Sequence, residues 1–257
     1  ETIHRLAPEH ATLMEVCGTH TVAIARNGIR DLMPEGLRLA SGPGCPVCVT
    51  CNRDIDTVIA LARIPNVTIT TFGDMTRFPV HLKLLAEQAA GRSVEIVYSP
   101  LDALAFAKAH PEREVVFVGV ASDDDAAVAM AIKRARAMGL SNFTVFAAHK
   151  NMPGALELLV GDPTLELDAL ILPGHVSTII GAEPYRFLAE KYGFPRDHGF
   201  EPVDVLQGIA MLVRQLHEGR AEIEIAYARG VMPEGNPVAL AAIDEVFETC
   251  TATWRGL

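Results

Sequence analysis

The stretch VVFVGVASDDDAAVAMAIKRARAMGLSNFTVFA, residues 115–147, holds a complete strand–helix–strand unit and decides the fold class. Residues 115–120 form a β-branched and aromatic run of strand length. Helix-forming composition follows over 124–138, and residues 143–147 form a second apolar strand. This alternation is typical of parallel βαβ units, so the stretch predicts a parallel sheet covered by helices.

The same alternation extends in both directions and predicts an α/β protein with two Rossmann-like domains, whose parallel sheets face a central cleft. Polar breaks near His110 and Gly219 suggest three segments. These are a first α/β domain (1–110) carrying the cysteine motifs, a second (111–220) carrying a Gly-His-Val motif, and a segment (221–257) that crosses back to the first domain. Further strands are expected at 37–41, 67–71, 94–98 and 168–172, and further helices at 55–62, 81–90, 101–109, 154–160, 182–192, 203–216 and 237–250.

Composition excludes several classes of function. The chain has 257 residues, 49% of them hydrophobic, and a formal net charge of −10 with a pI near 5.4. An acidic surface does not favour nucleic acid or anionic lipid, so we expect neither nucleic-acid nor membrane partners. No run approaches the roughly 18–20 apolar residues that span a bilayer, and no apolar leader follows Glu1. We therefore expect a cytoplasmic protein, whose thiols stay reduced unless they are used in catalysis.

Four of the five cysteines fall within 35 residues. Cys45 and Cys48 form a Cys-X-X-Cys pair, whose spacing lets both sulfurs share a disulfide or a metal ion. A helix expected to begin near Arg53 would lower the thiol pKa through its dipole. Gly42 and Gly44 precede the pair and are predicted to let a ligand or partner approach the backbone. The alternative is an inert reduced pair in a tight loop.

Cys51 extends the pair to Cys-X-X-Cys-X-X-Cys, which raises an iron–sulfur interpretation with Cys17 as fourth ligand. The continuation that two-cluster ferredoxins require is missing, so we favour Cys51 as a small residue at a helix start. Cys17 lies three residues before His20, which could lower the thiol pKa, bind metal or hydrogen-bond a polar ligand. Thr19 or Thr21 could instead cap a helix there.

Three loops follow predicted strands, at 42–51, 72–75 and 173–177, and are expected to converge on one rim where parallel strands end. Asp74 and His175 are the candidate functional side chains of the last two, with a helix-capping aspartate and a structural histidine as alternatives. The acidic run 123–125 is interpreted as a helix start. Dinucleotide-binding, Walker, nucleophile-elbow and His-Glu-X-X-His motifs are absent from the sequence, so the Rossmann-like pattern does not imply a nucleotide.

Several blocks together resemble one known family. The three long blocks are residues 14–21 (MEVCGTHT), 42–48 (GPGCPVC) and 173–181 (PGHVSTIIG). The chain resembles the HypD family of [NiFe]-hydrogenase maturation proteins from residue 3 to the last residue. Shorter supporting blocks lie at 71–75, 98–103, 199–206 and 254–257.

The resemblance implies an assembly scaffold with redox-active thiols rather than a conventional enzyme. Such a scaffold holds one iron ion, together with a small HypC-like chaperone, while cyanide and carbonyl ligands are attached, and a HypE-like protein donates the cyanide. Cys17 would be the iron-binding thiolate with His20 as its neighbour, Cys45 and Cys48 a redox-active dithiol, and His175 a residue lining the cleft from the second domain. Residues expected to contact the iron complex are Gly18, Thr19, Gly42, Gly44, Asp74, Gly174 and Ser177.

The chain departs from the family pattern in two places. The family carries Gly-Phe-Glu-Thr-Thr where this chain has residues 119–123, GVASD. The family also continues beyond the 254–257 block into a cysteine-rich segment that binds a [4Fe–4S] cluster, and Cys250 alone cannot hold such a cluster. We therefore expect no cluster on this chain by itself. Two alternatives stay open: a thiol–disulfide oxidoreductase using Cys45 and Cys48, and a divergent cluster-free binding module. Anaerobic iron binding that depends on Cys17 separates the scaffold from the oxidoreductase.

Overall fold

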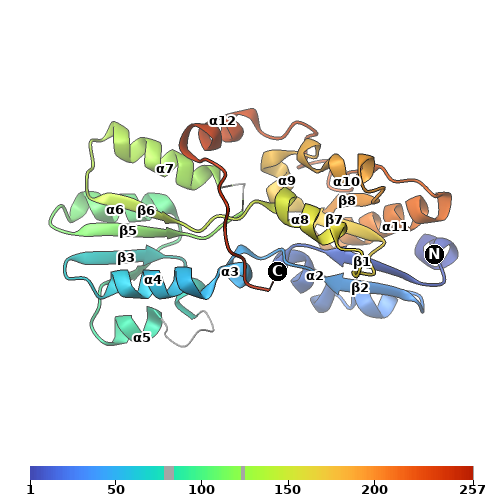
Figure 1. The fold of residues 1–257 in the computed structure, drawn as a ribbon, viewed down its shortest axis with the longest axis horizontal. Coiled ribbons are helices and arrows are strands. Elements are labelled where there is room, and N and C mark those ends of the chain that lie inside the picture. Colours follow the sequence, from blue (N-terminus) through green and yellow to red (C-terminus); the bar gives the residue numbers. More distant parts are fainter. Residues whose placement is uncertain (78–83, 123–124, 257) are drawn as a thin grey trace. The chain divides into compact units, whose positions relative to one another are not determined.

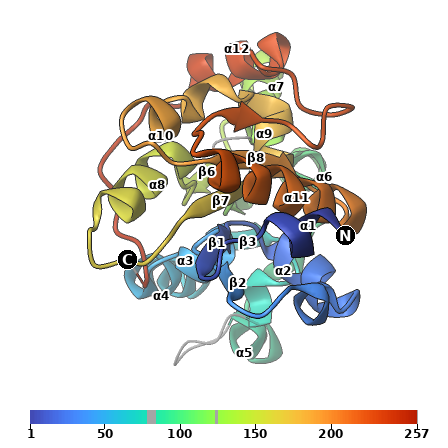
Figure 2. The same ribbon diagram turned by 90° about the vertical axis from the view of Figure 1, so that its right-hand side faces the viewer.

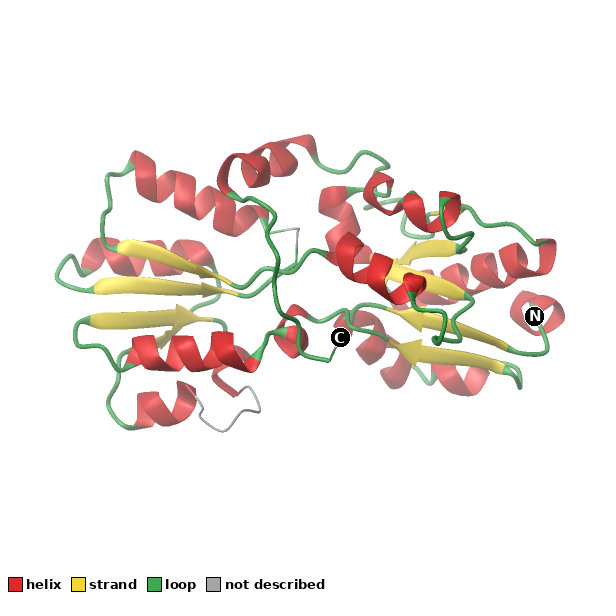
Figure 3. Ribbon diagram, viewed as in Figure 1, coloured by secondary structure: helices red, strands yellow, loops and turns green. Residues whose placement is uncertain are grey.

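The structure, a computed structural model, describes residues 1–77, 84–122 and 125–256. Its internal contacts divide the chain into two compact units, each built from strands and helices in alternation (Figures 1 and 3). Unit 1 comprises residues 1–45 and 151–240, and unit 2 comprises 46–150 and 241–257. Each unit contains one sheet in which all strand pairs are parallel, which confirms the predicted α/β class.

Unit 2 is built around the strand–helix–strand stretch of residues 115–147. Its sheet has the order β4-β3-β5-β6, and β5 contributes buried side chains to both faces. Val118 packs in the cluster formed with α4 and α5, whereas Val115 and Phe117 pack in the cluster formed with α6 and α7. Side chains of a strand alternate between faces, so this apolar run supplies both halves of the core. The elements are α3 (Pro46–Val49), α4 (Asn52–Ala62), β3 (Val67–Thr71), η2 (Met75–Arg77), α5 (Leu84–Ala89), β4 (Val94–Ile96), α6 (Pro100–Ala109), β5 (Glu114–Gly119), α7 (Ala126–Ala137) and β6 (Phe143–Ala147).

Unit 1 contains a five-stranded sheet with the order β2-β1-β7-β8-β9. Apolar side chains of α2 and α11 cover one face of this sheet, and α1 packs beside α11 (Figure 2). The elements are α1 (Thr2–Leu6), β1 (Ala11–Glu15), α2 (Gly18–Arg26), η1 (Ile29–Leu32), β2 (Leu37–Ser41), α8 (Met152–Gly161), β7 (Ala169–Pro173), α9 (Gly174–Ile180), η3 (Glu183–Tyr185), α10 (Phe187–Glu190), β8 (Arg196–Gly199), α11 (Pro202–Glu218) and β9 (Ile223–Glu224). Helix α12 (Pro237–Val246) begins in unit 1 and ends in unit 2.

The division by contacts differs from the predicted segments 1–110, 111–220 and 221–257. Strand β1 pairs with β2 on one side and with β7 on the other, so the first 45 residues share a sheet with the chain after residue 150. Position 110 lies between α6 and β5, which belong to the same unit. Strand pairing joins segments that are far apart in sequence, and a polar break does not reveal such pairing.

Two central strands of unit 1 were not predicted. Strand β1 consists of Ala-Thr-Leu-Met-Glu, of which all but the threonine have good helix propensity, and β8 consists of Arg-Asp-His-Gly. Both lie between two neighbouring strands, where tertiary context overrides local propensity. The predicted helix at 182–192 is instead two short elements, η3 and α10. The predicted helix at 81–90 and the acidic run 123–125 fall partly outside the described residues. Within the described residues, the structure has no helix of sufficient length and apolarity to cross a bilayer.

Candidate functional site

The candidate site lies where the strand order of unit 1 reverses. The chain runs from β1 outward to β2 and then returns to place β7 on the other side of β1. In open parallel sheets, ligands bind at the carboxyl ends of two such strands. Here the loop after β1 carries Cys17, and β7 is followed directly by Gly174 and His175. Asp74 follows β3 in unit 2, so the three loops follow strands of two different sheets.

Cys17 occupies the N-cap of α2 with an extended backbone, so the capping residue is the cysteine itself and neither Thr19 nor Thr21. Its thiol is buried, with a side chain only 8% exposed. Burial raises the pKa of the Cys17 thiol, and the nearby Glu15 carboxylate adds to the rise. The N–H groups of His20 and Thr19, with the Thr19 hydroxyl, act in the opposite direction. The thiol is therefore protonated at neutral pH but already faces donors that would stabilise a thiolate.

Glu15 is a site residue that the sequence analysis did not single out. Its carboxylate is buried and accepts a hydrogen bond from the Cys17 N–H at 3.0 Å and another from the Thr21 hydroxyl. These bonds hold the loop that presents the thiol. A buried carboxylate beside a thiol also makes a second negative charge unfavourable, and a metal cation would relieve this repulsion. In the sequence, Glu15 could have been recognised as an acidic residue at the end of a mainly apolar segment.

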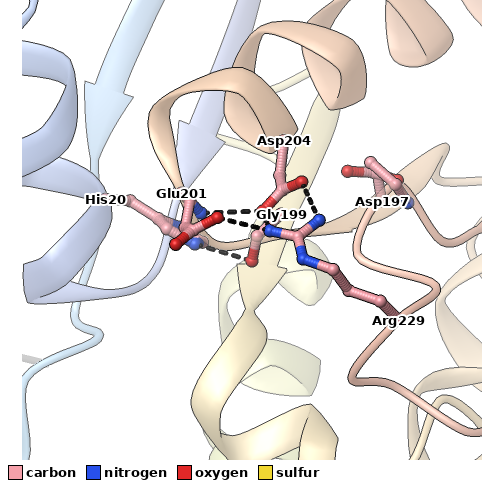
Figure 4. A network of polar contacts seen from close by, with 7 residues as sticks. His20, Asp197, Gly199, Glu201, Asp204 and Arg229 are labelled. Atoms are coloured by element: carbon pink, nitrogen blue, oxygen red, sulfur yellow. Dashed lines mark hydrogen bonds and ion pairs between the residues drawn. The ribbon is translucent and has the colours of Figure 1, made fainter.

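His20 is fully buried, and its ring orientation defines its tautomer (Figure 4). The Nε2 atom lies 2.9 Å from the Gly199 carbonyl oxygen, which can only accept, so Nε2 carries the proton. Nδ1 then has a free lone pair, and among the described residues this buried atom has no hydrogen-bond partner. Burial lowers the pKa of His20, so the ring is neutral at pH 7. A neutral imidazole with an open lone pair can accept a hydrogen bond or bind a metal ion.

Three glycines bring the Cys45 turn against the Cys17 loop. A Cβ at Gly44 would lie 1.9 Å from the Val16 carbonyl carbon and 2.2 Å from the Cys17 nitrogen. Gly44 is thus required for packing inside unit 1, which corrects the expectation that it leaves room for a partner. Gly42 donates its N–H to the Glu15 carbonyl at 2.7 Å, and a Cβ at Gly18 would lie 3.8 Å from the Cys45 Cβ. The Cys45 turn and the start of α2 are therefore neighbours.

The other two clustered cysteines belong to unit 2. Cys48 is exposed and lies in the single-turn helix α3, whereas Cys51 is buried and is the N-cap of α4, the helix-start position that we favoured. Cys45 is the last residue of unit 1, so the Cys-X-X-Cys motif includes the point where the chain passes from one unit to the other. Among the described residues, no three side chains of His, Cys, Asp or Glu are grouped as a metal site.

His175 lies in the first turn of α9 and is exposed. Its ring packs at a tilt against Phe200, with 4.2 Å between centroids, Phe200 packs on Tyr227 at 5.3 Å, and the Arg229 guanidinium lies 4.5 Å from the Tyr227 ring centre. Arg229 in turn pairs with both oxygens of Asp204, at 2.7 and 2.9 Å (Figure 4). His175 belongs to the same unit as Cys17 and His20, not to a second domain as predicted.

Gly174 and Ser177 serve the backbone of this site. A Cβ at Gly174 would lie 2.3 Å from the Gly199 carbonyl oxygen, the same atom that accepts from His20. The Ser177 hydroxyl donates to the Pro173 carbonyl and accepts from Nδ1 of His198, each at 2.8 Å. Both bonds are buried, so the Ser177 side chain holds α9 against β8. Asp74 is exposed, and its carboxylate accepts from the N–H of Met75, the first residue of η2, at 2.9 Å.

Strand β8, which presents the Gly199 carbonyl, contains a buried carboxyl group whose ionisation is linked to stability. Burial raises the pKa of Asp197 to about 7, well above the ordinary 3.8. The native state therefore keeps a proton between about pH 4 and pH 7 that the unfolded chain has lost, so Asp197 reduces stability as pH rises through this window. We expect Asp197→Asn to remove this pH dependence.

From pH 4 to pH 8, the free energy of unfolding of the Asp197→Asn variant should rise relative to that of the parent chain by up to about 4 kcal/mol. Denaturant titrations at several pH values measure it, with the exposed Asp31→Asn as the matched control. Parallel stability curves for the parent and Asp197→Asn would contradict the prediction.

Comparison with known proteins agrees with the sequence resemblance. The family model described as "HypD: Hydrogenase formation hypA family" matches residues 1–257. The chain is 45% identical to the hydrogenase maturation factor HypD of Rhodobacter capsulatus, with all of this chain and 69% of the relative aligned. It is 46% identical to the hydrogenase expression/formation protein HupD of Azotobacter chroococcum mcd 1, over 95% of this chain and 67% of the relative. For the HypD of Escherichia coli (strain K12), the identity is 41%, over 95% and 67%.

Fold and site together define an α/β protein with two parallel sheets that presents a buried thiol and a neutral imidazole at the switch point of one sheet. The thiol sits in a protected loop rather than in a nucleotide-binding turn. The chain belongs to the HypD family of hydrogenase maturation factors. It spans about two thirds of the length of the relatives it matches.

Proposed function

We propose that this chain is an assembly scaffold that holds one iron ion through the Cys17 thiolate while cyanide and carbonyl ligands are attached to it. The observation that best supports this proposal is the environment of the Cys17 thiol and the His20 imidazole. Both are buried, the thiol faces backbone donors, and the imidazole keeps an open lone pair at Nδ1. Soft thiolate suits iron that carries strong-field ligands. Iron binding would replace the thiol proton, so it is expected to release a proton and to weaken at low pH.

The side chains at this site fit only part of the coordination sphere of an iron ion. Because no group of three potential ligands occurs among the described residues, a single thiolate is the contribution best supported by the chain. The remaining positions of the iron would be filled by the diatomic ligands and by a residue of a small HypC-like partner, and a HypE-like protein would donate cyanide. The iron is cargo in this scheme, which explains why a complete cage of protein ligands is not needed. We place this activity in the cytoplasm.

Cys45 and Cys48 are proposed to act as the accompanying dithiol. Oxidation of the two thiols to one disulfide releases two electrons and two protons, which ligand attachment to iron can use. The exposed position of Cys48 also favours the second candidate, a thiol–disulfide oxidoreductase that binds no iron. Mass mapping after air oxidation is expected to show a Cys45–Cys48 disulfide under either proposal, and a Cys48–Cys51 link would contradict both.

Anaerobic purification of the chain with and without a HypC-like partner tests the scaffold. The expected result is about one iron per complex, with infrared bands of bound cyanide and carbonyl after incubation with a cyanide-donating HypE-like protein and a source of carbon monoxide. The chain alone should retain far less iron, because most ligands are then missing. A chain that forms the disulfide but never retains iron with the partner would leave the oxidoreductase as the better description.

A further inference from the structure

Residues 254–255 lie against the turn that carries Cys48, and both segments belong to unit 2. Trp254 forms an antiparallel β-bridge with Thr50. The Arg255 N–H donates to the Val49 carbonyl at 2.8 Å, and Arg255 Nε donates to the Cys48 carbonyl at 3.1 Å. The Arg255 side chain and the Cys48 backbone carbonyl that it bonds are separated by 207 positions in the sequence. One arginine therefore contacts two consecutive carbonyls of the helix that contains the thiol.

These contacts complete a helix that could not form alone. Helix α3 has four residues, and a single turn of helix is unstable in isolation. The last carbonyls of a helix have no donor within the helix. The Pro46 carbonyl is satisfied locally by the N–H and hydroxyl of Thr50, at 3.1 and 2.8 Å. Arg255 satisfies the Cys48 and Val49 carbonyls, so the cap of α3 is supplied by the distant C-terminal segment.

The Arg255 contact also places a permanent positive charge on the backbone of Cys48. The guanidinium donates to the backbone carbonyl of the same residue that carries the thiol. A cation at the C-terminal end of a helix interacts favourably with the helix dipole. The same cation favours the thiolate form of a nearby cysteine, and the thiolate is the reactive species. Because Cys48 is already exposed, its reactivity depends more on charge and backbone position than on access.

We propose that Arg255 is a positioning residue for Cys48, which caps α3 and increases the thiolate fraction of the exposed thiol. The inference rests on the proposed use of the Cys45–Cys48 dithiol. It concerns the chemistry of Cys48 itself, however, and requires neither iron nor a partner protein. A failure of the iron assay would therefore contradict the scaffold and leave this inference standing.

Alkylation kinetics of the reduced protein near neutral pH test the charge effect. The rate at Cys48 is divided by the rate at the exposed Cys250 of the same molecule, which corrects for reagent and pH. Arg255→Ala is expected to lower this ratio about threefold, the size of effect of one nearby charge in a solvated environment. Arg255→Lys should keep most of the ratio because the cation remains. The control Arg53→Ala removes an exposed positive charge close to Cys48 in sequence and should leave the ratio nearly unchanged.

Hydrogen exchange tests the cap separately. Exchange of the Thr50 amide, which bonds the Pro46 carbonyl, should accelerate measurably in Arg255→Ala, because the variant loses the bond from Nε to the Cys48 carbonyl and keeps only the backbone bond to Val49. Exchange in β5 serves as the check that unit 2 is still folded. An alkylation ratio that is unchanged or higher in Arg255→Ala, or that falls equally in Arg53→Ala, would overturn the proposal. Unchanged exchange at Thr50 would also overturn it.

Discussion

Gly44→Ala is expected to lower the free energy of unfolding by roughly 3 kcal/mol or more, the upper range for overpacking a buried site. The added methyl would lie 1.9 Å from the Val16 carbonyl carbon and 2.0 Å from its oxygen. Both are backbone atoms, so no change of rotamer can relieve the clash. Either the 42–45 turn or the Cys17 loop must move. Denaturant unfolding measures the loss directly.

The matched control is Gly18→Ala, because it adds the same methyl to the neighbouring segment. Its Cβ would meet only the Cys45 Cβ, at an ordinary contact distance of 3.8 Å, and alanine favours the helix that begins there. We expect a change within about 1 kcal/mol. If Gly44→Ala still folds, Cys17 should become accessible to alkylation, since the turn that packs on its backbone is displaced. Equal stability of the two variants would show that the turn is not packed as described.

Cys17→Ala is expected to reduce anaerobic iron retention at least about a hundredfold, beyond the 10–100-fold typical of residues that only orient a ligand. The variant removes the proposed thiolate, and the bands of bound cyanide and carbonyl should disappear with the iron. The fold should survive, because the N-cap backbone and the Glu15 carboxylate that accepts its N–H are retained. Iron analysis and infrared spectroscopy of the complex with the HypC-like partner provide the measurement.

Cys250→Ala serves as the control for this prediction, since it removes an exposed thiol outside the cysteine cluster. It should leave both iron content and infrared bands unchanged. A circular dichroism melt of Cys17→Ala distinguishes loss of the ligand from loss of the fold. Full iron content with intact bands in Cys17→Ala would exclude Cys17 as the iron ligand.

Much of unit 2 could be predicted from the sequence because its strands have a clear local pattern of strand-forming residues. The runs 67–71 and 143–147 match β3 and β6 residue for residue, and 115–120 differs from β5 by one residue at each end. A segment rich in β-branched and aromatic residues favours a strand whichever neighbours it meets, so pattern and structure agree. The cysteine motifs could also be recognised in the sequence, since clustered cysteines with glycine and proline are a local feature.

The rest depended on contacts that no local pattern encodes. Strands β1 and β8 are strands because neighbours on both sides complete their hydrogen bonds, although their sequences favour helix or solvent. Gly44 faces the backbone of Cys17, Glu15 accepts from its N–H, and Arg255 caps the helix of Cys48. The sequence by itself determined which chemical groups the protein has and where its self-sufficient strands lie. Only the tertiary structure decided which groups meet, because burial, tautomer and pairing are set by partners that are distant in the chain.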